Sequence, residues 1–228
     1  MNWSEAAENN KVLGFADIVL RSAGQVIIQN NPLSGAIVIA ALFVGSWRIA
    51  LFFLAGCVLA TLAAYVLKAE EGLLRAGGFG FAGGYAAILF GGFREAHHAG
   101  YTPGLWIALV FGVLFTVPLI SGSTWLLTKI GLLPLALPII VVFWIMVAGA
   151  LYDDLPKLAE AQIPQLVPAA TDTATAYTWG TAFDSLGNGF SGMFFITEPL
   201  TGYLMLLAVL VNSRIMAPWP SSPPACPS

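Results

Sequence analysis

The sequence predicts an all-α membrane protein with an internal repeat and re-entrant half-helices. The first observation behind this prediction is composition: 58% of the 228 residues are hydrophobic, 9% are charged, and the mean hydropathy is +0.82. A soluble domain carries roughly 25% charged residues. The second observation is a pair of similar segments far apart in the chain. The third is a polar break, followed by proline, inside each of them.

The two segments share the order of their residue types. Residues 24–46 read GQVIIQNNPLSGAIVIAALFVGS, and residues 191–213 read SGMFFITEPLTGYLMLLAVLVNS. Pro-Leu-Ser-Gly in the first segment corresponds to Pro-Leu-Thr-Gly in the second, at a constant offset of 167 positions. An internal repeat in a very apolar chain is typical of a transporter or channel with its site where the two copies meet.

The chain begins with a polar stretch, residues 1–19, which we expect to be an interfacial or disordered lead-in. Charged residues interrupt every apolar run here, so the stretch lacks the ~7–15 apolar residues of a signal peptide. These residues are Glu5, Glu8, Lys11 and Asp17.

Four apolar stretches follow the first repeated segment and are expected to span the membrane, since a spanning helix needs ~20 mostly apolar residues. The second stretch is rich in glycine, which lets helix backbones approach closely. The third contains Pro118, a potential kink. The stretches are residues 49–67, 73–93, 104–128 and 132–151.

Each repeated segment is interrupted near its middle. Asn30, Asn31 and Pro32 break the first, and Glu198 and Pro199 break the second. A polar break followed by proline favours a half-helix that enters the membrane and stops, which is tolerated where protein or a cavity surrounds it. The asparagines are expected to satisfy backbone groups at the break. Glu198 is either a functional group at membrane depth or an interfacial residue.

These elements divide the chain into five parts. Residues 1–19 are the lead-in, 20–151 the first repeat with about five spanning helices, 152–184 an exposed linker, 185–216 a partial second repeat, and 217–228 a Pro/Ser-rich tail. With the N-terminus inside, six Lys and Arg residues fall on the inner side and three on the outer side. This bias predicts a multi-pass protein of the inner or plasma membrane with a cytoplasmic N-terminus.

Several strings resemble the urea transporter family. Residues 29–35, Gln-Asn-Asn-Pro-Leu-Ser-Gly, resemble the opening of that family, and the glycine-rich residues 78–84 look like its Tyr-Gly-Phe-Asn-Gly motif. Leu-Ala-Leu-Pro at 135–138 is similar to its Leu-Thr-Leu-Pro-Phe motif, and Asn-Ser-Arg at 212–214 resembles the opening of its second half. The resemblance covers about residues 20–150 and 185–216.

The resemblance implies an inverted repeat, a homotrimer with one pore in each subunit, and urea as the solute. A urea pore needs a narrow slot with apolar walls for the flat faces of the solute and hydrogen-bonding groups for its edges, because stripping its water costs several kcal/mol otherwise. Carried over by motif, the pore positions are Gln25, Ile28, Ala82, Ala136, Gly192 and Phe195. The alternative for Gln25 is that it caps or satisfies backbone groups of the re-entrant segment, and the alternative for Phe195 is an ordinary lipid- or core-facing residue.

Several of these positions depart from the family pattern. Ile28 stands where the family has Phe, and Ala82, Ala136 and Gly192 stand where it has hydrogen-bonding side chains. The sequence therefore predicts facilitative passage of urea or a similar small neutral amide, with a truncated, non-conducting family member as the alternative. A membrane-embedded enzyme is the weakest reading. We expect no metal, cofactor or nucleic-acid partner, and His97-His98 does not have the spacing of a metal site on a helix.

Overall fold

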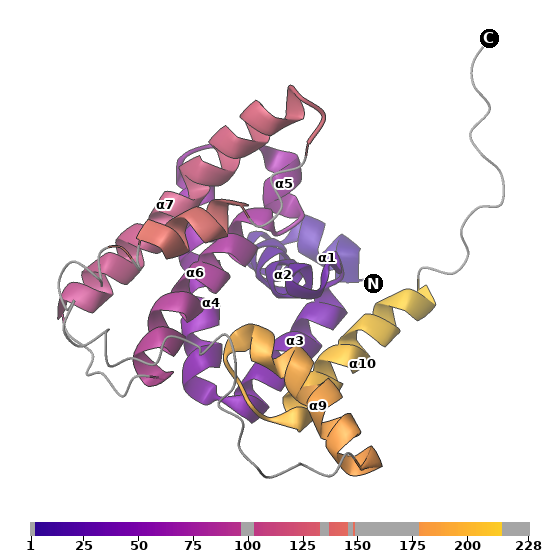
Figure 1. Ribbon diagram of the computed structural model, residues 1–228. Coiled ribbons are helices and arrows are strands. Elements are labelled where there is room, and N and C mark those ends of the chain that lie inside the picture. Colours follow the sequence, from indigo (N-terminus) through magenta and orange to yellow (C-terminus); the bar gives the residue numbers. More distant parts are fainter. Residues whose placement is uncertain (1–2, 97–102, 133–136, 146–147, 149–177, 216–228) are drawn as a thin grey trace.

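The computed structural model describes residues 3–96, 103–132, 137–145, 148 and 178–215, and within these ranges every regular element is a helix (Figure 1). In chain order the elements are α1 Trp3–Asn9, α2 Lys11–Gly24, η1 Gln25–Ile27, α3 Pro32–Gly45, α4 Trp47–Val66, α5 Glu71–Arg75, α6 Gly78–Ala96, α7 Pro103–Thr128, α9 Trp179–Ser191, η2 Gly192–Phe194 and α10 Pro199–Ile215. Residues 137–145 are also helical.

The two repeated segments fold alike. In each, a helix runs into a single 3₁₀ turn, the chain reverses, and a second helix begins at a proline. The bend between the two helices is 74° for the first pair, α2 and α3, and 83° for the second, α9 and α10. Ile28 and Phe195 end the two 3₁₀ turns with φ of 58° and 59°, in the left-handed region. The predicted breaks are confirmed, as bent helix pairs.

Local sequence explains where the first bend ends and α3 begins. Asn31 caps α3, since its side-chain oxygen accepts from the Leu33 N–H at 2.8 Å. Pro32 occupies the first helical position, where its missing N–H has no intrahelical partner to lose. The expectation that an asparagine satisfies backbone groups at the break is therefore confirmed for Asn31.

A glycine closes each bend. A Cβ on Gly35 would lie 2.6 Å from the carbonyl carbon of Leu20 and closer still to its oxygen. A Cβ on Gly202 would stand in the same relation to Gly187, again at 2.6 Å from the carbonyl carbon. Real Cβ atoms essentially never come within 3.0 Å of such atoms. The Gly of the repeated motif is therefore required by the close approach of the two helices.

The structure supports some of the predicted membrane spans more directly than others. α4 and α7 are long and apolar enough to cross a membrane, as expected for 49–67 and 104–128, and α7 continues through Pro118. The stretch 73–93 corresponds mainly to α6, Gly78–Ala96, while a turn with Gly77 at φ +81° places its first residues in α5. That this stretch crosses the membrane stays a prediction. The stretch 132–151 lies partly outside the described residues.

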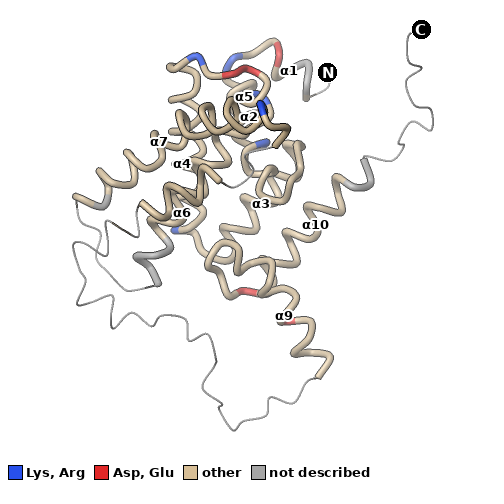
Figure 2. Tube along the Cα trace, turned by 45° about the horizontal axis from the view of Figure 1, so that its top comes forward, with Lys and Arg blue, Asp and Glu red and all other residues tan. Residues whose placement is uncertain are grey.

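In total, the described residues include two candidate spans, or up to four if each bent pair counts as one. Figure 2 shows that, among the described residues, most charged side chains gather at the end of the molecule where α1, α5 and the start of α2 lie. Such a distribution leaves the remaining helices almost free of charge, as a bilayer requires.

The five-part division of the chain stays a prediction. α9 begins at Trp179, ahead of residue 185, where the sequence analysis begins the second repeat. Residues 152–177 of the expected linker 152–184 and the whole tail, 217–228, lie outside the described residues.

Glycines and aromatics pack the core. Gly83 of α6 lies against α4, where an added Cβ would come within 2.6 Å of the Gly56 oxygen. The close helix approach expected from the glycine-rich segment is thereby confirmed. Phe194 of the second bent pair is fully buried against α4 and α6. Its ring stacks on Tyr85 at 5.4 Å and meets Phe53 edge-on at 6.1 Å between ring centroids.

Candidate functional site

The two bent pairs meet through α3 and α10, which cross and pack on one another (Figure 1). The Ser34 hydroxyl donates to the Ala208 carbonyl at 2.9 Å, and both residues are fully buried. Ala41 and Thr201, which occupy the equivalent positions of the opposite copy, are also fully buried. The seam between the copies is thus built from small side chains.

The ends of α3 and α10 make reciprocal contacts. Asn212, near the end of α10, donates through Nδ2 to Gln29 Oε1 and accepts from Asn31 Nδ2 at 3.1 Å. Gly45, its counterpart at the end of α3, packs on Ile196, the counterpart of Gln29. The end of α10 therefore contacts the first break, and the end of α3 contacts the second break. The contact at Asn212 is made by hydrogen bonds, and the contact at Gly45 is made with the side chain of Ile196.

A second network holds the first break from within its own copy. Arg21 donates to the Asp17 carboxylate at 2.6 Å, and its guanidinium also reaches the backbone and side-chain oxygens of Asn30 at 3.2 and 3.0 Å. Trp3 of α1 donates from its indole N–H to the same Asp17 at 2.6 Å. The N-terminal helix is thereby linked through one carboxylate to the residue at the break.

The predicted pore residues of the first copy fall in contrasting surroundings. Gln25 begins the 3₁₀ turn, is half-buried, and donates from Nε2 to the Ala76 carbonyl at 2.9 Å. Ile28 is 87% exposed. Ala82 is buried in the α4–α6–α7 core, at 1% exposed. Ala136 lies outside the described residues.

The second copy repeats part of this arrangement. Phe195 occupies the position equivalent to Ile28 and is 51% exposed, while Gly192, equivalent to Gln25, is also exposed. The two left-handed residues are therefore exposed apolar side chains at matching places. Glu198 is exposed at the second break, and its carbonyl accepts from the Thr201 N–H at 3.1 Å. Pro199 begins α10, as Pro32 begins α3.

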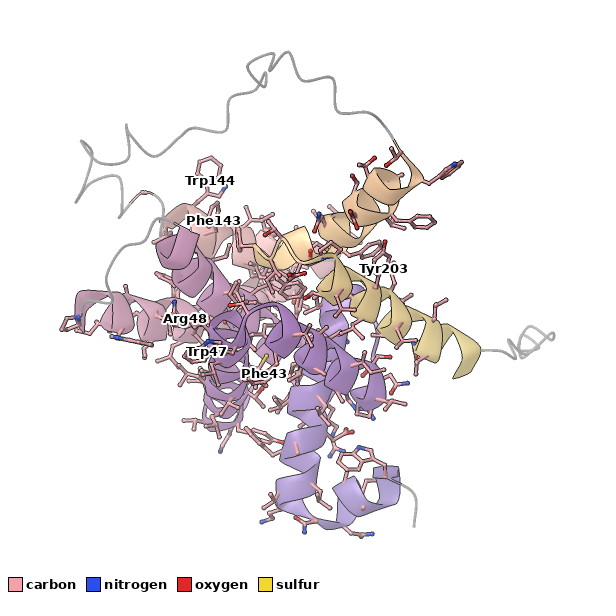
Figure 3. The ribbon with its side chains drawn as sticks, turned by 90° about the horizontal axis from the view of Figure 1, so that it is seen from below. Phe43, Trp47, Arg48, Phe143, Trp144 and Tyr203 are labelled. Carbon is pink, nitrogen blue, oxygen red and sulfur yellow. The ribbon has the colours of Figure 1, made fainter. Side chains whose placement is uncertain are left out.

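Aromatic residues lie at two helix junctions, between α9 and α10 and between α3 and α4 (Figure 3). Tyr203 lies at the junction of α9 and α10, where its hydroxyl donates to the Phe183 carbonyl at 2.7 Å and braces the second bend. Trp47 and Arg48 begin α4, close to Phe43 at the end of α3, and the Arg48 guanidinium lies 5.5 Å from the Trp47 ring centroid. Such pairs are typical of a membrane–water boundary.

Sequence reasoning missed Asn212 as a site residue. The available signal was the comparison of the two copies, because an amide in α10 stands where α3 has Gly45. The Ala76 carbonyl that binds Gln25 gave no signal, since any residue type supplies a carbonyl. Within the described ranges, no group of three or more His, Cys, Asp or Glu residues has a metal-binding arrangement.

The fold and the site define a class of protein: a helical membrane protein whose paired broken helices meet through the seam between α3 and α10. Residues 16–219 match the family model described as urea transporter. The chain belongs to the urea transporter family, whose members are transporters and not enzymes.

Curated relatives are distant. The chain is 26% identical over 222 residues to urea transporter 1 of Rattus norvegicus and 25% identical over 222 residues to that of Mus musculus. Each alignment covers 94% of this chain and 55% of the relative. Urea transporter 1 of Ovis aries is 34% identical over 90 residues, which cover 40% of this chain and 22% of the relative. The chain thus spans about half the length of the rat and mouse relatives it matches.

Proposed function

We propose that this chain provides channel-like, facilitative passage for urea or a similar small neutral amide. Membership in the urea transporter family supports this, and one structural observation carries it. Both copies break at the same place, and each break presents an exposed apolar side chain in the left-handed conformation, Ile28 in one and Phe195 in the other. Both residues end a helical turn that is closed by the bonds from Gln29 N–H to Gly24 O and from Ile196 N–H to Ser191 O. Glycine is the usual residue at such an end, so a large exposed apolar side chain at both matching positions favours a functional reason.

The proposed slot uses apolar walls and one amide. Ile28 and Phe195 supply walls for the flat faces of the solute. Gln25 lies one helical turn before Ile28, and its Nε2 is engaged by the Ala76 carbonyl. This bond fixes the amide so that Oε1 is the group available to accept from an NH₂ of the solute. Gln25 is therefore proposed as the main polar group of the pore.

Weak selectivity is part of the proposal. Ala82, Ala136 and Gly192 are proposed as pore positions and have no side-chain hydrogen-bonding group, and Ala82 is buried among α4, α6 and α7. Each missing partner leaves part of the dehydration of urea uncompensated. We expect the pore to discriminate urea from acetamide or formamide by only a small factor.

A flux assay tests the function. The purified chain is reconstituted in proteoliposomes, and urea uptake is followed beside empty liposomes, with glycerol as a neutral solute without an amide. Saturable or selective urea flux above the empty control supports the proposal. Flux equal to that of empty liposomes removes it and favours the non-conducting alternative.

The finer architecture is proposed with the function. The reciprocal contacts of α3 and α10 are what a twofold relation between the copies requires, since residue i then meets j and j meets i. We propose that this relation is inverted across the membrane, that the N-terminus is cytoplasmic, and that the subunits form a homotrimer. Reporter fusions at the N-terminus test the orientation, and native mass spectrometry in detergent tests the trimer.

A further inference from the structure

We infer that Asn212 is a positioning residue through which the second copy holds the break of the first copy in place. The inference rests on the proposed function, because the break it holds carries Ile28 and follows Gln25. It concerns a residue on α10, far along the chain from the break, and outside the proposed pore set.

The geometry uses both halves of one amide. Asn212 is 8% exposed, donates from Nδ2 to Gln29 Oε1 and accepts at Oδ1 from Asn31 Nδ2. Asn31 in turn uses its own Oδ1 to cap α3 through the Leu33 N–H. A side chain must supply a donor and an acceptor without charge to do this, as an amide, a hydroxyl or a neutral imidazole does.

The position is specific to the first break. By the repeat, the counterpart of Asn212 is Gly45 and the counterpart of Gln29 is Ile196. Glycine has no side chain to hydrogen-bond, so at this point the second break meets α3 through Ile196 and the Thr201 side chain instead of an amide pair. The first break is also bound from its own copy, through Arg21 and Asn30. Losing Asn212 therefore leaves that break held from one side only.

The seam around Asn212 favours positioning over simple stability. One turn away, the Ser34 hydroxyl already ties α3 to the Ala208 carbonyl of α10, and small buried residues pack the crossing. The two helices thus have a contact that is independent of the amide. The amide adds a hold on Gln29 and Asn31, which are break residues.

Hydrogen–deuterium exchange of the full chain in nanodiscs tests this directly. In Asn212→Leu, which is similar in size and cannot hydrogen-bond, exchange of residues 24–35 should rise at least about fivefold, because the bonds to both Gln29 and Asn31 are lost. Residues 191–202, the second break, should be unchanged and serve as the internal reference. Gln29→Leu removes the acceptor of the Asn212 Nδ2 bond, and should also raise exchange of residues 24–35 while leaving residues 191–202 unchanged.

Two further variants separate positioning from a general loss of packing. The swap Gln29→Asn with Asn212→Gln keeps the amide pair and should restore slow exchange. Thr201→Val removes a buried hydroxyl that has no hydrogen-bond partner among the described residues, and should leave residues 24–35 as in the parent. Unchanged exchange in Asn212→Leu, equal increases at both breaks, or failure of the swap overturns the inference.

Urea flux by the same proteins shows whether the hold matters for passage. Asn212→Leu should lower the maximal flux, and the swap should recover it. A parent chain that passes no urea removes the proposed function, while the exchange result still decides whether Asn212 holds the break. A conducting parent and an Asn212→Leu variant with full flux overturn its role in passage.

Discussion

Replacing Gly202 or Gly35 by alanine should disrupt the bent pair that each glycine closes. In both copies the new methyl group would lie 2.6 Å from a backbone carbonyl carbon, against the 3.4 Å at which ordinary contact begins. Backbone atoms cannot rotate away as a side chain does. We therefore expect a cost at the upper end of overpacking, about 3 kcal/mol, which lowers the apparent Tm by about 6–12 °C for a chain of this size.

Thermal unfolding in detergent, followed by tryptophan fluorescence and by the fraction that remains monodisperse, measures this cost. Gly189→Ala is the matched control, because Gly189 lies in α9 of the same bent pair and an added Cβ there meets nothing within 4 Å. The better helix propensity of alanine, worth about 1 kcal/mol, should leave the Tm unchanged or slightly higher. A Gly202→Ala variant as stable as Gly189→Ala would refute the argument for the close approach.

Three other outcomes are expected. Gln25→Leu should lower urea flux at least about fivefold, since one hydrogen bond to the solute is lost; proteoliposome uptake measures it, and unchanged uptake removes Gln25 from the pore. Ile28→Phe should raise the selectivity for urea over glycerol by a few fold, because an aromatic wall stacks on the flat solute, whereas Phe195→Ala should lower it. Asp17→Asn should lower the apparent Tm by a few degrees, because Arg21 keeps its charge but loses its carboxylate partner; an unchanged Tm would show that this ion pair contributes nothing.

The sequence predicts the breaks well because their causes are local. An asparagine cap and a proline at the first helical position act within a few residues, so Asn31 and Pro32 locate the start of α3 correctly. The repeat then transfers the same prediction to Pro199. Composition predicts the spans α4 and α7 for a similar reason, since length and hydropathy are properties of one segment.

Long-range contacts explain what the sequence left open. A left-handed Ile28 is not indicated by its residue type, because β-branched residues rarely adopt that conformation. The structure shows it at a helix end closed by the bond from Gln29 N–H to Gly24 O. The turn at Gly77 places the start of α6 at Gly78 rather than at residue 73. Asn212 became visible as a partner of the first break only when the two copies were brought together.

Phe194 has a consequence for how a solute could be moved. A carrier that alternates between two open states rocks one half of the molecule against the other. Here the fully buried ring of Phe194 lies between Phe53 of α4 and Tyr85 of α6. Withdrawing it at every turnover would cost on the order of 1.5–3 kcal/mol, before any hydrogen bond between α3 and α10 is broken. For the proposed passage, this buried contact favours diffusion through a stationary constriction, and we expect its rate to depend only weakly on temperature.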